Sequence, residues 1–225
     1  MFSAEANWKL VVQNNLECYH CQPAHPTYCA AHRGVPLGKP TGTMAAFAYE
    51  SILTALPESQ SERKRQFAPR YIGPDAPNWQ LMARGFIGEA CATESVGGKP
   101  VAPLMGQCAY EGVQTFALPS PLTSLYLNPD YVAVYSFTPR SLRETDIEVI
   151  WLVDENAVEG VDFETSQVVA VWEPTLREDK TLAENTQLGI ESSAYRPGPY
   201  IETEAWVGDF DRWYLREVIN EPMPD

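Results

Sequence analysis

Three β-rich segments separated by short turns lie in the middle of the chain, and they constrain its fold most. They span residues 123–127, 131–139 and 145–153, with turns at 128–130 and around 140–144. Runs of β-branched and aromatic residues between such turns are typical of neighbouring antiparallel strands. Helical patterns follow from about residue 161. Strands followed by helices predict an α+β fold, in which an antiparallel sheet carries its helices on one side.

Helices are expected on both sides of this β region. Residues 7–21 contain no Pro or Gly and predict a helix that Pro23 and Pro26 then break. Residues 78–88 could form a short helix, and residues 204–220 a last one. The sequence Thr175-Leu176-Arg177-Glu178 has the pattern of a capping box that would open a helix over 179–190. No linker is evident, so residues 1–225 are expected to form a single domain.

Composition and charge exclude several classes of protein. The 225 residues are 44% hydrophobic, which is enough for a core, and the formal net charge is −14. An acidic chain is a poor match for nucleic acid or for an anionic membrane surface. No apolar run approaches the roughly 20 residues of a membrane span, and the N-terminus lacks the pattern of a signal peptide. The odd number of cysteines (18, 21, 29, 91 and 108) predicts free thiols in a reducing cytoplasm.

All three histidines of the chain lie near its N-terminus. His20 and His25 are five residues apart, His32 follows, and Glu17 precedes His20 by three residues. On a continuous helix Asn14, Glu17 and His20 would share one face. Two imidazoles at a helix end and one remote carboxylate can form a facial triad, which leaves positions open on Fe(II). The alternative is that these are ordinary surface or core histidines.

A zinc site is a second alternative for the same segment. Cys18, Cys21, Cys29 and His32 have the spacing C-x2-C-x7-C-x2-H, which is close to that of structural zinc sites. This interpretation leaves Glu17 and His25 without a role. Metal analysis would separate an iron site, a zinc site and a protein without a transition metal.

The segment also resembles a known motif. Asn7-Trp8-Lys9, Asn14, Glu17-Cys18-Tyr19-His20 and His25-Pro26 resemble the mononuclear-iron motif of the Rieske non-haem iron oxygenases, whose α subunits include the ring-hydroxylating oxygenases. The similarity continues through residues 101–106, 157–162, 172–179, 187–190 and 193–199. The variant Glu17-Cys18-Tyr19-His20-Cys21 is similar to the branch that acts on quaternary amines such as glycine betaine, stachydrine, choline or carnitine.

This resemblance implies a fold and a role for each residue. The fold would be of the helix-grip type (SRPBCC or Bet v1-like), an antiparallel sheet packed on a long C-terminal helix. His20, His25 and Asp179 would bind a mononuclear Fe(II). Glu17 would bridge this iron to the Rieske cluster of a neighbouring subunit, and Asn14 would lie near the iron.

The resemblance also implies a reaction and its partners. O2 would be the co-substrate, and a small methylated amine would be hydroxylated or demethylated in a cavity lined by aromatic side chains, since cations bind to aromatic faces. Family members are expected to be homotrimers. No Rieske domain is recognisable in residues 1–225, so electrons are expected from a [2Fe–2S] centre on a separate donor or a missing domain. The alternative is a helix-grip protein that binds a small molecule without turnover.

Overall fold

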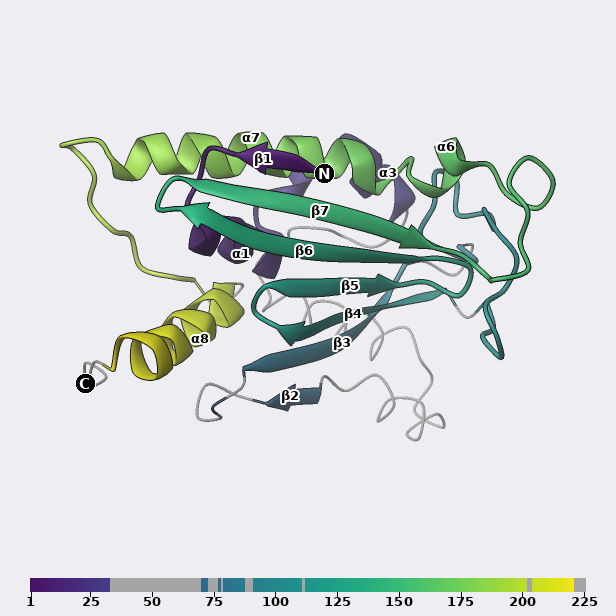
Figure 1. Ribbon diagram of the computed structural model, residues 1–225, viewed down its shortest axis with the longest axis horizontal. Helices are drawn as coiled ribbons and strands as arrows, with labels where there is room; N and C mark the ends of the chain where they lie inside the picture. The colour runs from purple at the N-terminus through teal and green to yellow at the C-terminus, as the bar shows by residue number, and fades with distance from the viewer. Residues whose placement is uncertain are drawn as a thin grey trace.

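The computed structural model describes residues 1–32, 70–72, 77, 79–87, 91–110, 112–201 and 204–220. Within them lies a seven-stranded antiparallel sheet with strand order β1-β7-β6-β5-β4-β3-β2 (Figure 1). The strands are β1 (Phe2–Ala4), β2 (Arg70–Ile72), β3 (Gln80–Phe86), β4 (Val113–Ser120), β5 (Thr123–Leu127), β6 (Val132–Ser141) and β7 (Glu144–Leu152).

The predicted antiparallel sheet of an α+β fold is confirmed. The segments expected at 123–127, 131–139 and 145–153 are β5, β6 and β7, and each pairs with the next. Burial alternates along β5 and β6, as a sheet covered on one face requires. The helix expected at 78–88 is wrong, because β3 occupies this segment and pairs with β2 on one side and β4 on the other. Pairing on both edges outweighs the local preference of the segment.

The helices lie mainly on one face of the sheet. Helices α1 and α7 pack against each other there, and α7 also runs beside β1 (Figure 1). The last helix expected at 204–220 is confirmed as α8 and η3. The longest described helix, α7, precedes it, so the long C-terminal helix that the resemblance implies is not confirmed, and the helix-grip assignment remains a prediction. The helices are α1 (Trp8–Leu16), α2 (Cys21–Ala24), α3 (Pro26–Ala31), α6 (Thr165–Val168), α7 (Trp172–Ile190), α8 (Ala205–Tyr214) and a π-helical turn, η3 (Leu215–Ile219).

The N-terminal helix is shorter than predicted. Helix α1 begins after Asn7, whose side chain accepts a hydrogen bond from the Lys9 backbone N–H, and it ends at Leu16. Glu17 is extended, with φ −133° and ψ 165°, so the predicted common helix face of Asn14, Glu17 and His20 does not exist. Pro23 lies within the short α2 rather than ending a helix. A proline is tolerated in a first turn because its missing N–H would have no partner there.

The chain between α1 and α2 is closed by a disulfide between Cys18 and Cys21. The expectation of free thiols is therefore wrong for this pair, whereas Cys29, Cys91 and Cys108 are not in a disulfide. The bond spans the turn in which Tyr19 and His20 lie. This turn redirects the chain after α1, which a helical pattern in the sequence could not indicate.

Helix α7 begins three residues before the predicted capping box. Thr175 is buried inside the helix, and its Oγ1 donates a hydrogen bond of 2.8 Å to the carbonyl oxygen of Val171. Threonine makes this bond to the preceding turn within helices. The capping-box prediction is therefore wrong, and Glu178 and Asp179 lie within α7 instead of at its start.

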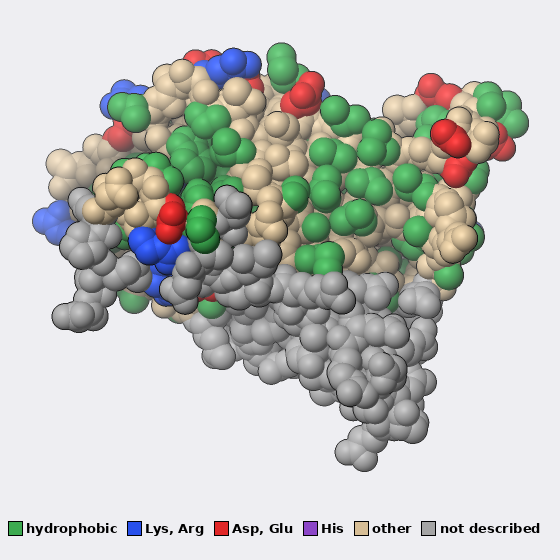
Figure 2. Space-filling view, turned by 60° about the horizontal axis from the view of Figure 1, so that its bottom comes forward, with side chains coloured by type: hydrophobic (Ala, Val, Ile, Leu, Met, Phe, Trp, Pro, Cys, Tyr) green, Lys and Arg blue, Asp and Glu red, His purple; other side chains and the backbone are tan. Residues whose placement is uncertain are grey.

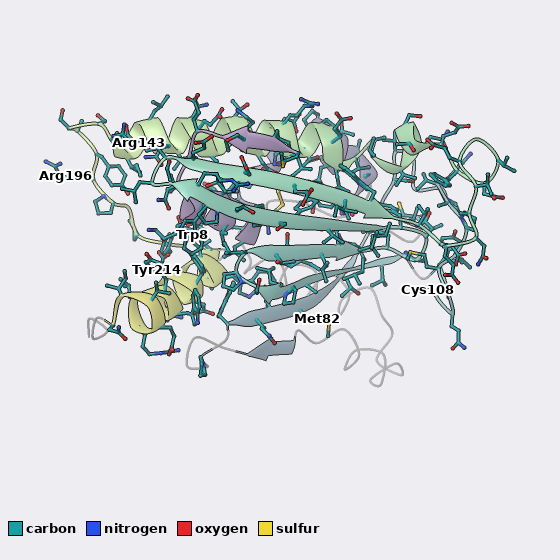
Figure 3. All side chains as sticks on the ribbon, viewed as in Figure 1. Trp8, Met82, Cys108, Arg143, Arg196 and Tyr214 are labelled. Carbon is teal, nitrogen blue, oxygen red and sulfur yellow. A yellow bond between two sulfur atoms is a disulfide. The ribbon has the colours of Figure 1, made fainter. Side chains whose placement is uncertain are left out.

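Two further features of the fold are an aromatic contact between α1 and α8 and a partly exposed hydrophobic face. Trp8 of α1 packs edge-on against Phe210 and Tyr214 of α8, at ring distances of 5.9 and 5.8 Å (Figure 3). Ile150 and Leu152 of β7 are about half exposed, and hydrophobic side chains gather on the face of the molecule shown in Figure 2. No helix among the described residues is long and apolar enough to cross a membrane.

Candidate metal centre

The structure brings His20, His25 and Asp179 together beneath α1. His20 Nε2 lies 3.0 Å from His25 Nε2, and Asp179 Oδ1 lies 3.3 Å from the first nitrogen and 3.0 Å from the second. His20 comes from the turn before α2, His25 from the junction of α2 and α3, and Asp179 from α7. Three donor atoms from two distant stretches of the chain therefore form a nearly equilateral triangle.

A second carboxylate fixes the orientation of each imidazole. Glu17 Oε1 lies 2.5 Å from His20 Nδ1, and Glu178 Oε2 lies 2.8 Å from His25 Nδ1. Since an ionised carboxylate only accepts hydrogen bonds, each Nδ1 is the protonated nitrogen. When the imidazoles are neutral, the lone pairs of both Nε2 atoms therefore point into the triangle. Such carboxylate–histidine pairs are typical of imidazoles that bind metals.

Asn14 completes the contacts of the carboxylate. Its Nδ2 donates a hydrogen bond of 2.7 Å to Asp179 Oδ1, the oxygen that also faces both imidazoles. Asn14 is in the last turns of α1, so its amide fixes the position of Asp179 across the α1–α7 interface. Of the residues singled out from the sequence, Asn14, Glu17, His20, His25 and Asp179 thus lie in one cluster.

The carboxylates of the cluster favour a positive charge on or between its two imidazoles. Burial alone would lower the pKa of His20, but its hydrogen bonds to Asp179 and Glu17 raise that pKa to about 9. The pKa of His25 is also raised, by Asp179 and Glu178 against the effect of burial. Burial would raise the pKa of Asp179, yet the two histidines hold it below its usual value. The site favours a proton, or a metal ion, between these groups.

The donor set fits a six-coordinate divalent metal. Atoms on one face of an octahedron, each about 2.1 Å from the ion, lie about 3.0 Å apart. The observed distances of 3.0, 3.0 and 3.3 Å agree with this value. Two imidazoles and one carboxylate also form the donor set that non-haem Fe(II) sites use.

The alternative zinc site is not formed by the described residues. Cys18 and Cys21 are bonded to each other, so neither is a thiolate. His32 is also engaged elsewhere, since its Nδ1 donates to the carbonyl oxygen of Tyr28 at 2.8 Å and its Nε2 lies 2.8 Å from Glu94 Oε1. The zinc interpretation is therefore wrong for Cys18, Cys21 and His32.

An aromatic cavity adjoins the donor triangle. Its volume is about 30 Å³, it is partly open to solvent, and His25 and Asp179 are among the residues that line it. Tyr28, Tyr126 and Trp172 line it, with ring distances of 5.4 Å between Tyr28 and Trp172 and 3.9 Å between Tyr126 and Trp172. These three residues were not identified from the sequence as lining a cavity. Tyr28, three residues after His25, was the one that spacing could have indicated.

A buried carboxylate holds the wall of this cavity. Glu94 is 1% exposed, and its Oε2 accepts hydrogen bonds from Trp172 Nε1 at 3.0 Å and Gln114 Nε2 at 3.1 Å. Its Oε1 lies 2.8 Å from His32 Nε2. Because His32 ends α3 and His25 begins it, the same network fixes the helix that carries one donor of the triangle.

Comparisons with known proteins identify the family of the chain. Residues 2–219 match the family described as ring hydroxylating alpha subunit (catalytic domain). The glycine betaine monooxygenase oxygenase subunits of Pseudomonas aeruginosa and Chromohalobacter salexigens are 32% and 31% identical to the chain over 96% of its length. A carnitine monooxygenase oxygenase subunit of Acinetobacter pittii is 70% identical over 23 residues, which are 10% of this chain and 6% of that protein. The chain spans about half the length of the curated relatives it matches, 49% and 48% for the first two.

Solved structures show the same fold at low identity. The quaternary ammonium Rieske monooxygenase CntA in complex with L-carnitine matches with a TM-score of 0.54 and 17% identity, over 96% of this chain and 47% of that one. Naphthalene 1,2-dioxygenase from Rhodococcus matches with a TM-score of 0.52 and 10% identity, over 99% and 56%. The match over residues 2–219 shows that this chain belongs to the family of ring hydroxylating alpha subunits, in the part that forms their catalytic domain.

Proposed function

We propose that the chain is the catalytic domain of a mononuclear non-haem Fe(II) oxygenase that hydroxylates or demethylates a small quaternary or methylated amine. The observation that carries this proposal is the triangle of His20, His25 and Asp179 beside an aromatic cavity. Fe(II) held there would bind and activate O2 at its open coordination positions. The relatives named as glycine betaine and carnitine monooxygenase subunits support the family and the substrate class.

Residues of the chain would bind the metal, and neighbouring carboxylates would keep its ligands correctly oriented. His20 Nε2, His25 Nε2 and Asp179 Oδ1 would be the ligands. Glu17 and Glu178 keep the Nδ1 protons on the far side of both rings, so that the Nε2 lone pairs are free. With these groups pre-oriented, little rearrangement would be needed on binding iron.

The aromatic residues would select a cation. Tyr28, Tyr126 and Trp172 line the cavity together with Asp179. A trimethylammonium group is well matched to aromatic faces, because the ring quadrupole attracts a cation that has no hydrogen bonds to lose. One N-methyl carbon of such a substrate would then lie close to the metal, and its hydroxylation would lead to loss of formaldehyde.

Electrons would come from a Rieske [2Fe–2S] centre outside the described residues. Within these residues His32 is paired with Glu94 and Cys18 with Cys21, so they do not form a cluster site. Glu17 has 14% of its side chain exposed and contacts His20, which suits a role as the bridge to such a centre on a neighbouring subunit. We therefore propose a homo-oligomer, a trimer by family resemblance, with a Rieske or reductase donor as its partner.

The test is reconstitution without oxygen. The protein is purified anaerobically, loaded with Fe(II) and analysed for metal, and about one iron per chain is expected, with less in His25→Ala. O2 consumption and formaldehyde release are then measured with a Rieske donor and a panel of methylated amines. Stoichiometric zinc in place of iron would contradict the proposal. Amine binding without any turnover with a competent donor would indicate a binding protein instead.

A further inference from the structure

The disulfide between Cys18 and Cys21 lies beside the donor triangle. Cys21 follows His20 directly and is 5% exposed. Both cysteines line the aromatic cavity together with His25 and Asp179. The pair therefore faces the space in which metal and substrate would lie, and it is not a surface disulfide remote from the site.

The sulfur of Cys21 is within reach of both imidazoles. Its Sγ and one ring nitrogen each of His20 and His25 all lie within 4.8 Å of one another. In the disulfide this sulfur is a weak neutral ligand. Once the disulfide is reduced, the same atom becomes a thiol, and a metal can displace its proton to bind the thiolate.

We propose that Cys21 is a redox-controlled metal ligand. With the disulfide closed, the donors at the site are two imidazoles and one carboxylate. When a dithiol reduces the disulfide, two electrons and two protons pass from the dithiol to the two sulfurs, the S–S bond breaks, and the dithiol becomes a disulfide. Cys21 then joins His20 and His25 around the metal.

The state of this bond would set the choice of metal. Thiolates are soft ligands that favour zinc and cobalt, whereas a nitrogen and oxygen donor set suits Fe(II). Closing the disulfide would thus protect an iron site against zinc. The inference relies on the metal centre of the proposed function, but it needs neither turnover nor a Rieske donor.

Cobalt(II) is the probe, because thiolate ligands give it an intense charge-transfer band in the near ultraviolet. The full chain is prepared with the disulfide intact, or reduced with a dithiol that is removed before Co(II) is added without oxygen. We expect the band only in the reduced protein. Zn(II) affinity should rise on reduction by about tenfold or more, which equals about 1.4 kcal/mol.

A matched pair of variants assigns the sulfur. Cys18→Ser frees Cys21 and should show the band without any reductant, whereas Cys21→Ser frees only Cys18 and should lack it. Cys29→Ser is the control, since Cys29 Sγ donates to the Cys21 carbonyl oxygen at 3.4 Å and is another thiol close to the site. It should keep the band after reduction. Circular dichroism checks that each variant is folded.

The outcomes separate this inference from the proposed function. If Co(II) binds both redox forms and neither reduced wild type nor Cys18→Ser shows the band, the inference is overturned and the metal centre stands. Loss of the band in Cys29→Ser would also overturn it, because the ligand would then be Cys29. If neither form binds Co(II), the inference and the metal centre fail together.

Discussion

The imidazoles of His20 and His25 are held by similar contacts that differ in their surroundings. Glu17 holds His20 from an extended residue after α1, and Glu178 holds His25 from within α7. Both carboxylates are partly exposed, at 14% and 32% of their side chains. Only Glu17 was identified from the sequence, because Glu178 was interpreted as the last residue of a capping box.

Replacing either carboxylate by its amide should weaken iron binding. Glu178→Gln and Glu17→Gln each remove a charge that orients one imidazole, and such changes lower metal affinity by about 10–100-fold. Equilibrium titration with Fe(II) under anaerobic conditions measures this effect. An unchanged affinity in both variants would show that the two contacts are not needed to hold the ligands.

At saturating iron the two variants should differ. If Glu17 is the bridge for electrons, Glu17→Gln should slow turnover with a Rieske donor far more than it weakens substrate binding. Glu178→Gln is the matched control and should turn over at a rate near that of the wild type. Equal rates in the two variants would remove the special role of Glu17. Single-turnover measurements with a chemically reduced donor give the comparison.

Secondary structure elements were predictable where local pattern and tertiary pairing agree. β5, β6 and β7 follow from their alternating residues and turns. The end of helix α1 after Leu16 was not predictable from the sequence. It depends on the Cys18–Cys21 bond and on the hydrogen bond that Glu17 accepts from the Tyr19 backbone N–H. Strand β3 was mistaken for a helix, since its pairing with β2 and with the more distant β4 is a tertiary contact that the local pattern does not show.

The candidate site was partly predictable for a similar reason. The clustered histidines indicated a metal, but spacing alone could not select a carboxylate 150 or more residues away; the family resemblance supplied Asp179. A cavity lined by aromatic side chains was expected, but the residues that line it were not identified. Tyr28, Tyr126 and Trp172 come from three separate elements, and only the folded chain shows that they share a cavity.

The network of Glu94 links elements that carry the cavity, so its loss should be costly. Glu94→Ala would leave His32, Trp172 and Gln114 without their shared partner in a buried place. Breaking a buried pair typically costs about 3–5 kcal/mol of the free energy of unfolding. Urea denaturation measures this loss. Glu164→Ala, at an exposed position, is the control and should change the free energy by less than about 0.5 kcal/mol.

For the whole molecule, iron should act as a stabilising ligand. Free Fe(II) at 100 times its dissociation constant would add about 2.7 kcal/mol to the free energy of unfolding. For a chain of this size the midpoint of thermal unfolding should rise by about 5–10 °C. Anaerobic differential scanning calorimetry measures the shift. Asp179→Asn should show little or none, and an equal shift in this variant would place the iron elsewhere.

The donors of the triangle come from two short stretches near opposite ends of the described chain. His25 and Glu178 are separated by 153 positions, and Asn14 and Asp179 by 165. A metal bound there is a removable cross-link that closes a very long loop, and such closures reduce the entropy of the unfolded chain. Contacts of this sequence separation also form late in folding. A single cut in the intervening chain should therefore leave two fragments that metal holds together and a chelator loosens.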